Sequence, residues 1–499
     1  MLKPSIIVKD LVVKTQEETV LDGISFSLFP NQHLALVGNA GSGKTALIKA
    51  LAGRVYTKGK VEFNFSIEKT GIHLVEQRSL IKNLSGISDF YYQQRFNSYD
   101  ADDAPTVYEE LLKASSKGSK QTNNNDSYLA IDFTLAILGI EYLKNSPLIQ
   151  LSSGEHKRFQ LAKSLVNPPA LLMLDTPYTG LDVKGVKELN KLLSVISIKG
   201  TQIILIPGTF EVPDFITHIG FLENKKFIFF NKENFKAEDH KTETNNFSFN
   251  TELLPVSKTS PRFETIVEIK NAHLNYGAHT IFKGLNWKVA EGEKWLLKGR
   301  NGSGKSSLLS LITGDHPQAY SNEIYLFGKR RGSGESIWDI KQKTGFISPE
   351  LHAYFDKNVS CFQAIGSGFF DTIGLFKKLS TTQYNIILQW LDFLQLSHVS
   401  TKPLHSISAS LQRMILLARA LVKNPPLLVL DEPCQGLDQK QSELFISLID
   451  SICFGSNKTL IYVSHDERYV PDCIDKIFEL EKDGVKNYSI MERELVEIA

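Results

Sequence analysis

Two copies of one glycine-rich loop, at residues 38–45 and 299–306, limit the fold of this chain more than any other feature. Each copy follows a short apolar run and precedes a helix-forming stretch, which is the strand, loop and helix setting of a phosphate-binding loop. Further blocks repeat with them, such as residues 171–177 with residues 427–433. A chance match to this loop is improbable once and negligible twice. The repeat therefore predicts a duplicated module.

With 499 residues, the chain is long enough for two modules that each have a core. Short β-rich runs alternate with helical stretches, and the apolar runs that end in Asp are typical of buried parallel strands. We therefore predict an α/β fold, in which each module is a mostly parallel sheet with flanking helices. The predicted first domain covers residues 1–230 and the second covers residues 263–499. Residues 231–262 are polar and aperiodic, which predicts a surface linker.

Composition excludes several classes of protein. The formal net charge is +1, so the chain lacks the overall basic field of a typical nucleic-acid binder. The four cysteines form no Cys-x-x-Cys pair, which argues against a zinc site, an iron–sulfur cluster and a disulfide framework. No apolar stretch is long enough to span a bilayer. We expect a cytoplasmic protein, with peripheral attachment to an inner membrane left open, and expect any membrane part to be a separate chain.

The two loops are expected to bind a nucleotide. Their glycines let backbone N–H groups surround phosphates, while the following helix N-terminus favours negative charge. Lys44 and Lys305 should reach the β- and γ-phosphates, and the hydroxyls of Thr45 and Ser306 should bind Mg²⁺. The alternative is a glycine turn that binds nothing. The predicted binding residues are Gly38, Asn39, Ala40, Gly41, Ser42, Gly43, Lys44 and Thr45, with Gly299, Arg300, Asn301, Gly302, Ser303, Gly304, Lys305 and Ser306.

The motifs after each loop resemble those of the ABC ATPases. Residues 151–155 and residues 407–411, which we call the signature segments, each precede a predicted helix, an Asp-ending strand and a Gly-Leu-Asp triplet. This order covers nearly the whole chain twice and is highly specific as a combination. The resemblance implies two P-loop NTPase (ABC ATPase) domains, each with a small antiparallel β part and a helical subdomain. It also implies ATP and Mg²⁺ as ligands and ATP hydrolysis as the activity.

In this family two such domains pack head to tail, so that each ATP lies between the phosphate loop of one and the signature segment of the other. On this implication the first site takes Lys44, Thr45, Gln77 and Asp175 from the first module and Ser408 from the second. The second site takes Lys305, Ser306, Asp431, Glu432 and His465 from the second module, with Ser152 and Gly154 from the first. The implied metal ligands are Thr45, Gln77, Asp175, Ser306 and Asp431.

The two sites are not equally complete. Glu432 is the candidate general base of the second site, whereas Thr176 at the matching position has a hydroxyl that is no comparable base. Loss of a general base costs roughly 10²- to 10⁴-fold in rate. Pro207 is aligned with His465, the imidazole expected to contact the γ-phosphate. The first site is thus predicted to hydrolyse ATP very slowly.

The signature segment and the adenine contact also make the first site less complete than the second. Ser410 and Leu411 replace the glycine and glutamine that the family has there, and added bulk should hinder backbone approach to the phosphate. Tyr276 is predicted to stack on adenine in the second site, with Thr15 at the equivalent position of the first. Tyr276 as an exposed strand residue is the alternative. The glutamine that matches Gln77 is missing from the second module, where either Glu350 or Pro349 takes its place.

Among tandem ABC ATPases, the chain looks most like the ModF type, which the family associates with molybdenum transport. The expected function is an ATPase that energises transport through separate membrane permease subunits. The alternative is an ATPase outside transport, an ATP-dependent switch on the ribosome or on nucleic acid. Residues 329–332 form a basic run that is predicted to be a solvated turn, with binding of an anionic partner as the alternative.

Overall fold

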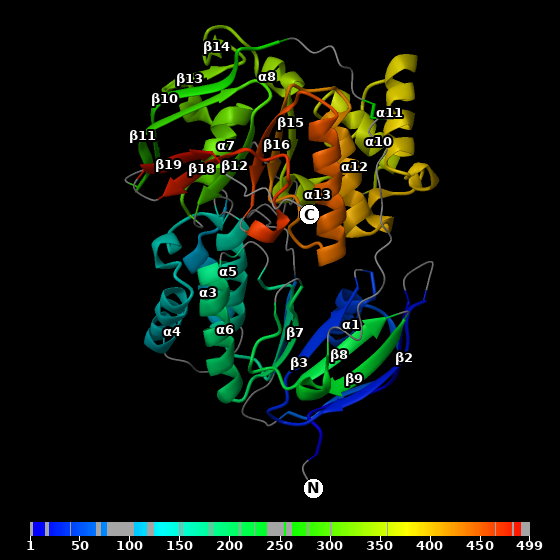
Figure 1. The fold of residues 1–499 in the computed structure, drawn as a ribbon. Helices are drawn as coiled ribbons and strands as arrows, with labels where there is room; N and C mark the ends of the chain where they lie inside the picture. Colours follow the sequence, from blue (N-terminus) through cyan, green and yellow to red (C-terminus); the bar gives the residue numbers. More distant parts are fainter. Residues whose placement is uncertain are drawn as a thin grey trace, which may run out of the picture. The chain divides into compact units, whose positions relative to one another are not determined.

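The chain forms two compact units in a computed structural model, which we call the first unit (mainly residues 1–88 and 98–244) and the second unit (mainly residues 245–435 and 439–499). Each unit is described by itself (Figure 1). The structure describes residues 3–14, 19–39, 41–65, 71–76, 104–116, 124–148, 151, 153–178, 181, 183–208, 211–223, 225–236, 254–255, 262–276, 279–299, 302–356, 358–464, 466–481 and 484–490.

A six-stranded sheet with the order β5-β6-β7-β3-β8-β9 forms the centre of the first unit. Its neighbouring strands run parallel, except for the antiparallel β8 and β9. The strands are β3 (Leu34–Gly38), β5 (Ile72–Val75), β6 (Leu171–Asp175), β7 (Gln202–Ile206), β8 (His218–Glu223) and β9 (Lys226–Asn231).

Both faces of this sheet are buried. Leu171 and Met173 of β6 belong to one hydrophobic cluster, and Leu172 and Leu174 belong to another. Side chains alternate between the two faces of a strand, so the two clusters cover opposite faces. This double burial is why β6 is a continuous apolar run rather than an alternating pattern.

A second, antiparallel sheet of the first unit has the order β2-β1-β4. Helices α3, α4 and α5 pack against one another and form a helical subdomain, coloured cyan in Figure 1. The strands are β1 (Ile6–Lys14), β2 (Thr19–Leu28) and β4 (Thr57–Phe63). The helices are α1 (Lys44–Leu51), α3 (Val107–Ser116), α4 (Asn124–Ile137), α5 (Ser153–Leu165) and α6 (Val183–Ile198), with 3₁₀ turns η2 (Glu141–Leu143) and η4 (Lys232–Asn234).

The second unit repeats this architecture. Its six-stranded sheet has the order β15-β16-β17-β12-β18-β19, which matches the first unit position by position, including one antiparallel edge pair. Its antiparallel sheet has the order β11-β10-β13-β14. The strands are β10 (Thr265–Tyr276), β11 (His279–Ala290), β12 (Lys294–Gly299), β13 (Glu323–Leu326), β14 (Lys329–Arg330), β15 (Thr344–Ile347), β16 (Leu427–Asp431), β17 (Thr459–Val463), β18 (Lys476–Glu481) and β19 (Gly484–Ile490).

Helices α10, α11 and α12 pack together as the helical subdomain of the second unit. The helices are α7 (Lys305–Thr313), α8 (Ile337–Lys343), α9 (Pro349–Tyr354), α10 (Cys361–Gly366), α11 (Thr381–Phe393), α12 (Ala409–Leu421) and α13 (Gln439–Phe454). The 3₁₀ turns are η7 (Pro317–Tyr320), η8 (Ser367–Phe369), η9 (Ser397–Val399), η10 (Leu404–Ser406) and η11 (Glu467–Tyr469).

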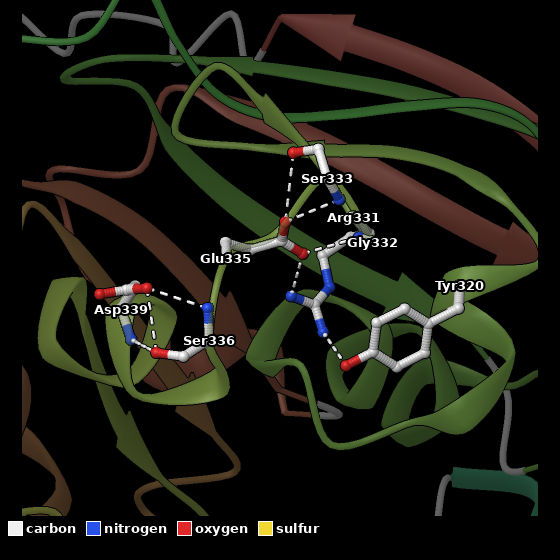
Figure 2. A network of polar contacts seen from close by, with 7 residues as sticks. All are labelled: Tyr320, Arg331, Gly332, Ser333, Glu335, Ser336 and Asp339. Atoms are coloured by element: carbon white, nitrogen blue, oxygen red, sulfur yellow. Dashed lines mark hydrogen bonds and ion pairs between the residues drawn. The ribbon is translucent and has the colours of Figure 1, made fainter.

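The basic run at residues 329–332 is only partly a solvated turn. Lys329 and Arg330 are exposed, but the side chain of Arg331 is 0% exposed and pairs with Glu335 at 2.7 Å (Figure 2). Arg331 also donates to the Tyr320 hydroxyl at 3.2 Å. The prediction of a wholly solvated run was therefore wrong for Arg331, because a carboxylate four residues later neutralises it inside the fold.

The predicted α/β fold with two similar modules is confirmed by the matching strand orders. The proposed boundaries at residues 230/231 and 262/263 stay predictions, and most of residues 231–262 lie outside the described residues. All four cysteines are free thiols. In the described part of the chain, no helix combines the length and the apolar character that crossing a membrane requires.

Candidate nucleotide sites

The phosphate loop of the first unit joins β3 to α1, and two of its glycines are required by its shape. At Gly38, with φ of 141°, a Cβ atom would lie 2.1 Å from the carbonyl oxygen of Leu222. At Gly43, with φ of 99°, it would lie 2.6 Å from Cδ2 of Leu21. A side chain at either position would collide with the neighbouring strand and strain the backbone.

The loop of the second unit has the same shape between β12 and α7. A Cβ atom at Gly299 would lie 2.4 Å from the carbonyl oxygen of Leu480, and one at Gly304 would lie 2.4 Å from Cγ2 of Ile281. The φ angles, 156° and 95°, are close to those of the first loop. Both loops therefore bring backbone close to the start of a helix, where amide groups favour an anion.

Each loop lysine folds back onto its own loop. The Lys44 ammonium donates to the carbonyl oxygens of Gly38 and Asn39, both at 2.7 Å. The Lys305 ammonium donates to the carbonyl oxygen of Gly299, also at 2.7 Å. Burial lowers the pKa of Lys44 to about 8, although the nearby Asp175 opposes this shift. A positive charge at the centre of each loop suits a phosphate ligand.

Two oxygen groups in the first unit fit Mg²⁺. Asp175 ends β6, is 4% exposed, and forms a hydrogen bond with the side chain of Thr45 at the start of α1. Burial raises the pKa of Asp175, while the Thr45 contact and nearby lysines act in the opposite direction. Mg²⁺ prefers hard oxygen ligands and commonly takes one or two from the protein with the rest from phosphates and water. Asp431, 8% exposed at the end of β16, and Ser306 are the equivalent pair.

The residue after each strand-ending Asp has an unusual backbone. Thr176 and Glu432 have φ angles of 46° and 44°, and their N–H groups donate to Ile206 at 3.1 Å and Val463 at 3.0 Å. The Thr176 hydroxyl is buried and has no hydrogen-bond partner among the described residues. The fold thus presents both side chains from equivalent points, but only Glu432 can accept a proton near neutral pH.

The two signature segments differ in the first turn of the helices that follow them. Ser408 is the N-cap of α12, where its hydroxyl accepts from the Leu411 N–H at 3.4 Å and lies 3.1 Å from the Ser410 hydroxyl. Ser410 is 9% exposed. In the first unit, Gly154 lies in the first turn of α5. The Ser410 hydroxyl therefore occupies the position in α12 where the first unit has Gly154.

The registers of paired strands show which residues of the two units occupy equivalent positions, and they refine two predicted matches. Asp175 pairs with Ile206 and Asp431 pairs with Val463, so Gly208 rather than Pro207 is the counterpart of His465. The prediction was off by one residue, but Gly208 has no imidazole either. Likewise, Val75 and Ile347 hold equivalent places beside β6 and β16.

This second register makes Pro349 the counterpart of Gln77. Pro349 opens α9 after the N-cap Ser348, and Glu350 lies one position further along the helix. The position of the glutamine is therefore filled in the second unit by a residue without a side-chain ligand.

Several predicted site residues are not placed by the structure. Those outside the described residues are Ala40, Gln77, Ser152, Arg300, Asn301 and His465. The backbone of Tyr276 ends β10, but its side chain is not described. The pairing of one unit's loop with the other unit's signature segment stays a prediction.

Two buried cations near these sites were missed by the motif analysis. Lys157 of α5 is 4% exposed and donates to the backbone carbonyl oxygens of Glu76 at 2.8 Å and Asp175 at 3.4 Å. Burial lowers its pKa to about 8. Arg413 of α12, 1% exposed, donates to the carbonyl oxygen of Gln435 at 3.1 Å. Each cation follows the signature serine of its own unit at the same spacing. This shared spacing could have identified both cations from the sequence.

The chain matches one family model twice and resembles two curated relatives over nearly its whole length. Residues 21–179 and 282–435 match the family model described as "ABC transporter". The ABC transporter ATP-binding protein ModF of Escherichia coli is 34% identical over 463 residues, which cover 90% of this chain and 91% of that protein. An uncharacterized ABC transporter ATP-binding protein of Schizosaccharomyces pombe is 32% identical over 485 residues, 93% and 96% of the two chains. A bacterial ABC transporter cassette solved as a dimer is 21% identical, with a TM-score of 0.40 over 46% of this chain and 100% of that one.

Proposed function

This chain is a tandem ATPase of the ABC transporter family, and from that premise we propose that its two cassettes use ATP unequally to energise transport through separate membrane subunits. The main support for unequal ATP hydrolysis is that Thr176 and Glu432 occupy equivalent backbone positions, with φ of 46° and 44°. One cassette places a carboxylate there and the other places a hydroxyl. At this position the two cassettes therefore share a positive φ and differ in their side chains.

The hydrolytic site is built on the second cassette in this proposal. Lys305 holds the β- and γ-phosphates, and Glu432 accepts or orients the proton of the attacking water. Ser306 and Asp431 would hold Mg²⁺, which offsets negative charge on the phosphates when it is bound. His465 contacts the γ-phosphate, while Tyr276 stacks on the base. Ser152 and Gly154 of the first cassette complete this site.

The degenerate site is built on the first cassette. Lys44, Thr45, Gln77 and Asp175 bind the nucleotide and its metal ion, with Ser408 from the second cassette. Thr176 supplies no general base, which lowers the rate by roughly 10²- to 10⁴-fold. Gly208 supplies no imidazole, and Ser410 and Leu411 add bulk at the signature segment. This site therefore retains ATP while the other turns over.

Transport as the purpose of hydrolysis rests on the relatives. The Escherichia coli and Schizosaccharomyces pombe proteins are each named as the ATP-binding protein of an ABC transporter. We propose that the present chain likewise acts with permease chains, on the cytoplasmic face of a membrane where ATP is available. Affinity purification from mild detergent should recover a membrane protein with this chain. ATP-dependent sedimentation with ribosomes, and no membrane partner, would contradict this part of the proposal.

The division of labour is tested with Glu432→Gln beside Thr176→Glu. Glu432→Gln should lower ATP turnover by about two orders of magnitude or more while ATP still binds. Thr176→Glu should restore little activity to the first site, because Gly208 and Ser410 remain. Retention of most turnover in Glu432→Gln would show that the second site is not the hydrolytic one. The stoichiometry of ATP bound to Glu432→Gln then reports whether the first site is filled.

A further inference from the structure

The side chain of Glu432 is held by the residue three positions after it. The amide nitrogen Nε2 of Gln435 donates to Oε2 of Glu432 at 2.7 Å. The backbone N–H of Gln435 also donates to the carbonyl oxygen of Glu432, at 3.1 Å. Gln435 thus closes the turn after β16 with its backbone and binds the Glu432 carboxylate of the same turn with its side chain.

Gln435 is itself fixed from α12. Arg413 is 1% exposed, and its Nη2 donates to the carbonyl oxygen of Gln435 at 3.1 Å. The neighbouring Cys434 thiol lies 3.6 Å from the hydroxyl of Tyr462, a fully buried residue of β17. The turn that contains Gln435 is therefore attached to a helix on one side and to the central sheet on the other.

We propose that Gln435 is a positioning residue for ATP hydrolysis, which acts by holding the Glu432 carboxylate in one orientation. A glutamate side chain has three rotatable bonds, and a hydrogen bond to one carboxylate oxygen limits the rotation of all three. A general base must sit within hydrogen-bond reach of the proton that it takes, so a fixed orientation favours reaction. This inference rests on the proposed role of Glu432.

The sequence of the first cassette agrees with this role. Thr179 is aligned with Gln435, and Thr176 is aligned with Glu432. The cassette that lacks the carboxylate therefore also lacks the amide that would hold it. The amide and the carboxylate form one functional pair, which occurs in the second cassette alone.

The test replaces Gln435 by methionine, which has a similar length and volume but no amide donor. Gln435→Met should lower kcat by roughly tenfold to a hundredfold, because small displacements of a catalytic group have effects of that size. The affinity for ATP should change by no more than about twofold, since Gln435 contacts the Glu432 carboxylate and, among the described residues, no part of the phosphate loop. Gln435→Ala provides a second variant with the same expected split.

The matched control is Gln342→Met. Gln342 is an exposed glutamine of α8 whose amide donates to the carbonyl oxygen of Phe369 at 3.0 Å. The control loses one glutamine hydrogen bond, as Gln435→Met does, but should keep the wild-type kcat. Thermal unfolding of all variants identifies any that are misfolded, and kcat is compared among those that are folded.

A double-mutant cycle with Glu432→Ala separates this role from a structural one. Single-turnover hydrolysis is measured for both single variants, for the double variant and for the wild type. If Gln435 acts through Glu432, then Gln435→Met has no further effect once the carboxylate is gone. An equal loss in both backgrounds, a wild-type kcat in Gln435→Met and Gln435→Ala, or a loss confined to ATP affinity would each overturn the inference. If Glu432→Ala itself keeps most of its turnover, the proposed function has failed instead.

Discussion

Thr176 and Glu432 share a left-handed backbone conformation at equivalent points of the two units, with φ of 46° and 44°. Each follows the Asp that ends a buried strand, and each donates its N–H to the neighbouring strand. This region of backbone space is an outlier for a β-branched residue such as Thr. The fold therefore imposes the conformation on both units, including the one in which no carboxylate uses it.

We expect Thr176→Gly to stabilise the first unit. A non-glycine residue in such a conformation costs about 1–3 kcal/mol, and the change also removes a buried hydroxyl without a partner among the described residues. Glycine loses more chain entropy on folding, so the expected net gain is about 1 kcal/mol in the free energy of unfolding. Urea denaturation measures it. Thr57→Gly in strand β4 is the control and should reduce stability, because Thr57 has no positive φ to relieve.

The duplicated fold could be predicted because its signals are local. The glycine loops and the Asp-ending strands each carry their own pattern, and the repeat doubles the evidence for both. The alignment of Pro207 with His465 failed by one residue, because the correct match depends on which strand residues pair across the sheet. The order of residues along the chain does not contain that register.

Contacts that depend on how the backbone folds explain what else was missed. Lys157 and Gln435 look like ordinary polar residues of a helix and a turn, and only the folded chain brings them to Asp175 and Glu432. The burial of Arg331 was hidden in the same way, because its pairing with Glu335 depends on how the intervening residues turn.

Glu335→Ala should destabilise the second unit by about 3–5 kcal/mol, since it leaves the buried guanidinium of Arg331 without its carboxylate. The side chains of this pair are 0% and 5% exposed, and Glu335 also accepts from the N–H groups of Gly332 and Ser333 (Figure 2). Denaturant unfolding measures the loss.

The control for this change is Glu188→Ala, which removes an exposed partner of Lys184 and should cost no more than about 0.5 kcal/mol. The double variant Arg331→Met with Glu335→Ala should be less destabilised than Glu335→Ala alone, because no unpaired charge remains. Equal stability of Glu335→Ala and Glu188→Ala would contradict the importance of the buried pair.

Loss of the loop lysines should affect ATP turnover unequally. Lys305→Ala removes the cation of the proposed hydrolytic site and should lower kcat by about two orders of magnitude or more. Lys44→Ala removes its counterpart from the degenerate site and should lower kcat much less. Steady-state ATPase assays of both variants measure the contrast. Similar losses in the two variants would argue that both sites hydrolyse ATP or that they depend strictly on each other.

Stability of the first unit should fall in mild acid because of His33. Its Nδ1 accepts a hydrogen bond from the Ile203 N–H at 3.2 Å, which requires that nitrogen to be unprotonated. Burial lowers the pKa of His33 to about 4 from its ordinary value of 6.5. Between pH 4 and pH 6.5, His33 is protonated in the unfolded chain but stays neutral in the folded chain. The contribution of His33 is therefore complete above pH 6.5 and decreases as the pH falls toward 4.

This loss should reach up to about 3 kcal/mol, because one pKa unit corresponds to about 1.4 kcal/mol. The variant His33→Asn keeps an oxygen that can accept from Ile203 but does not titrate, so its stability should change less between neutral pH and the acid range. His398→Asn, at an exposed histidine, should keep the wild-type pH dependence. Urea midpoints measured across this range compare the three proteins. An identical acid loss in His33→Asn and the wild type would assign the pH dependence to other groups.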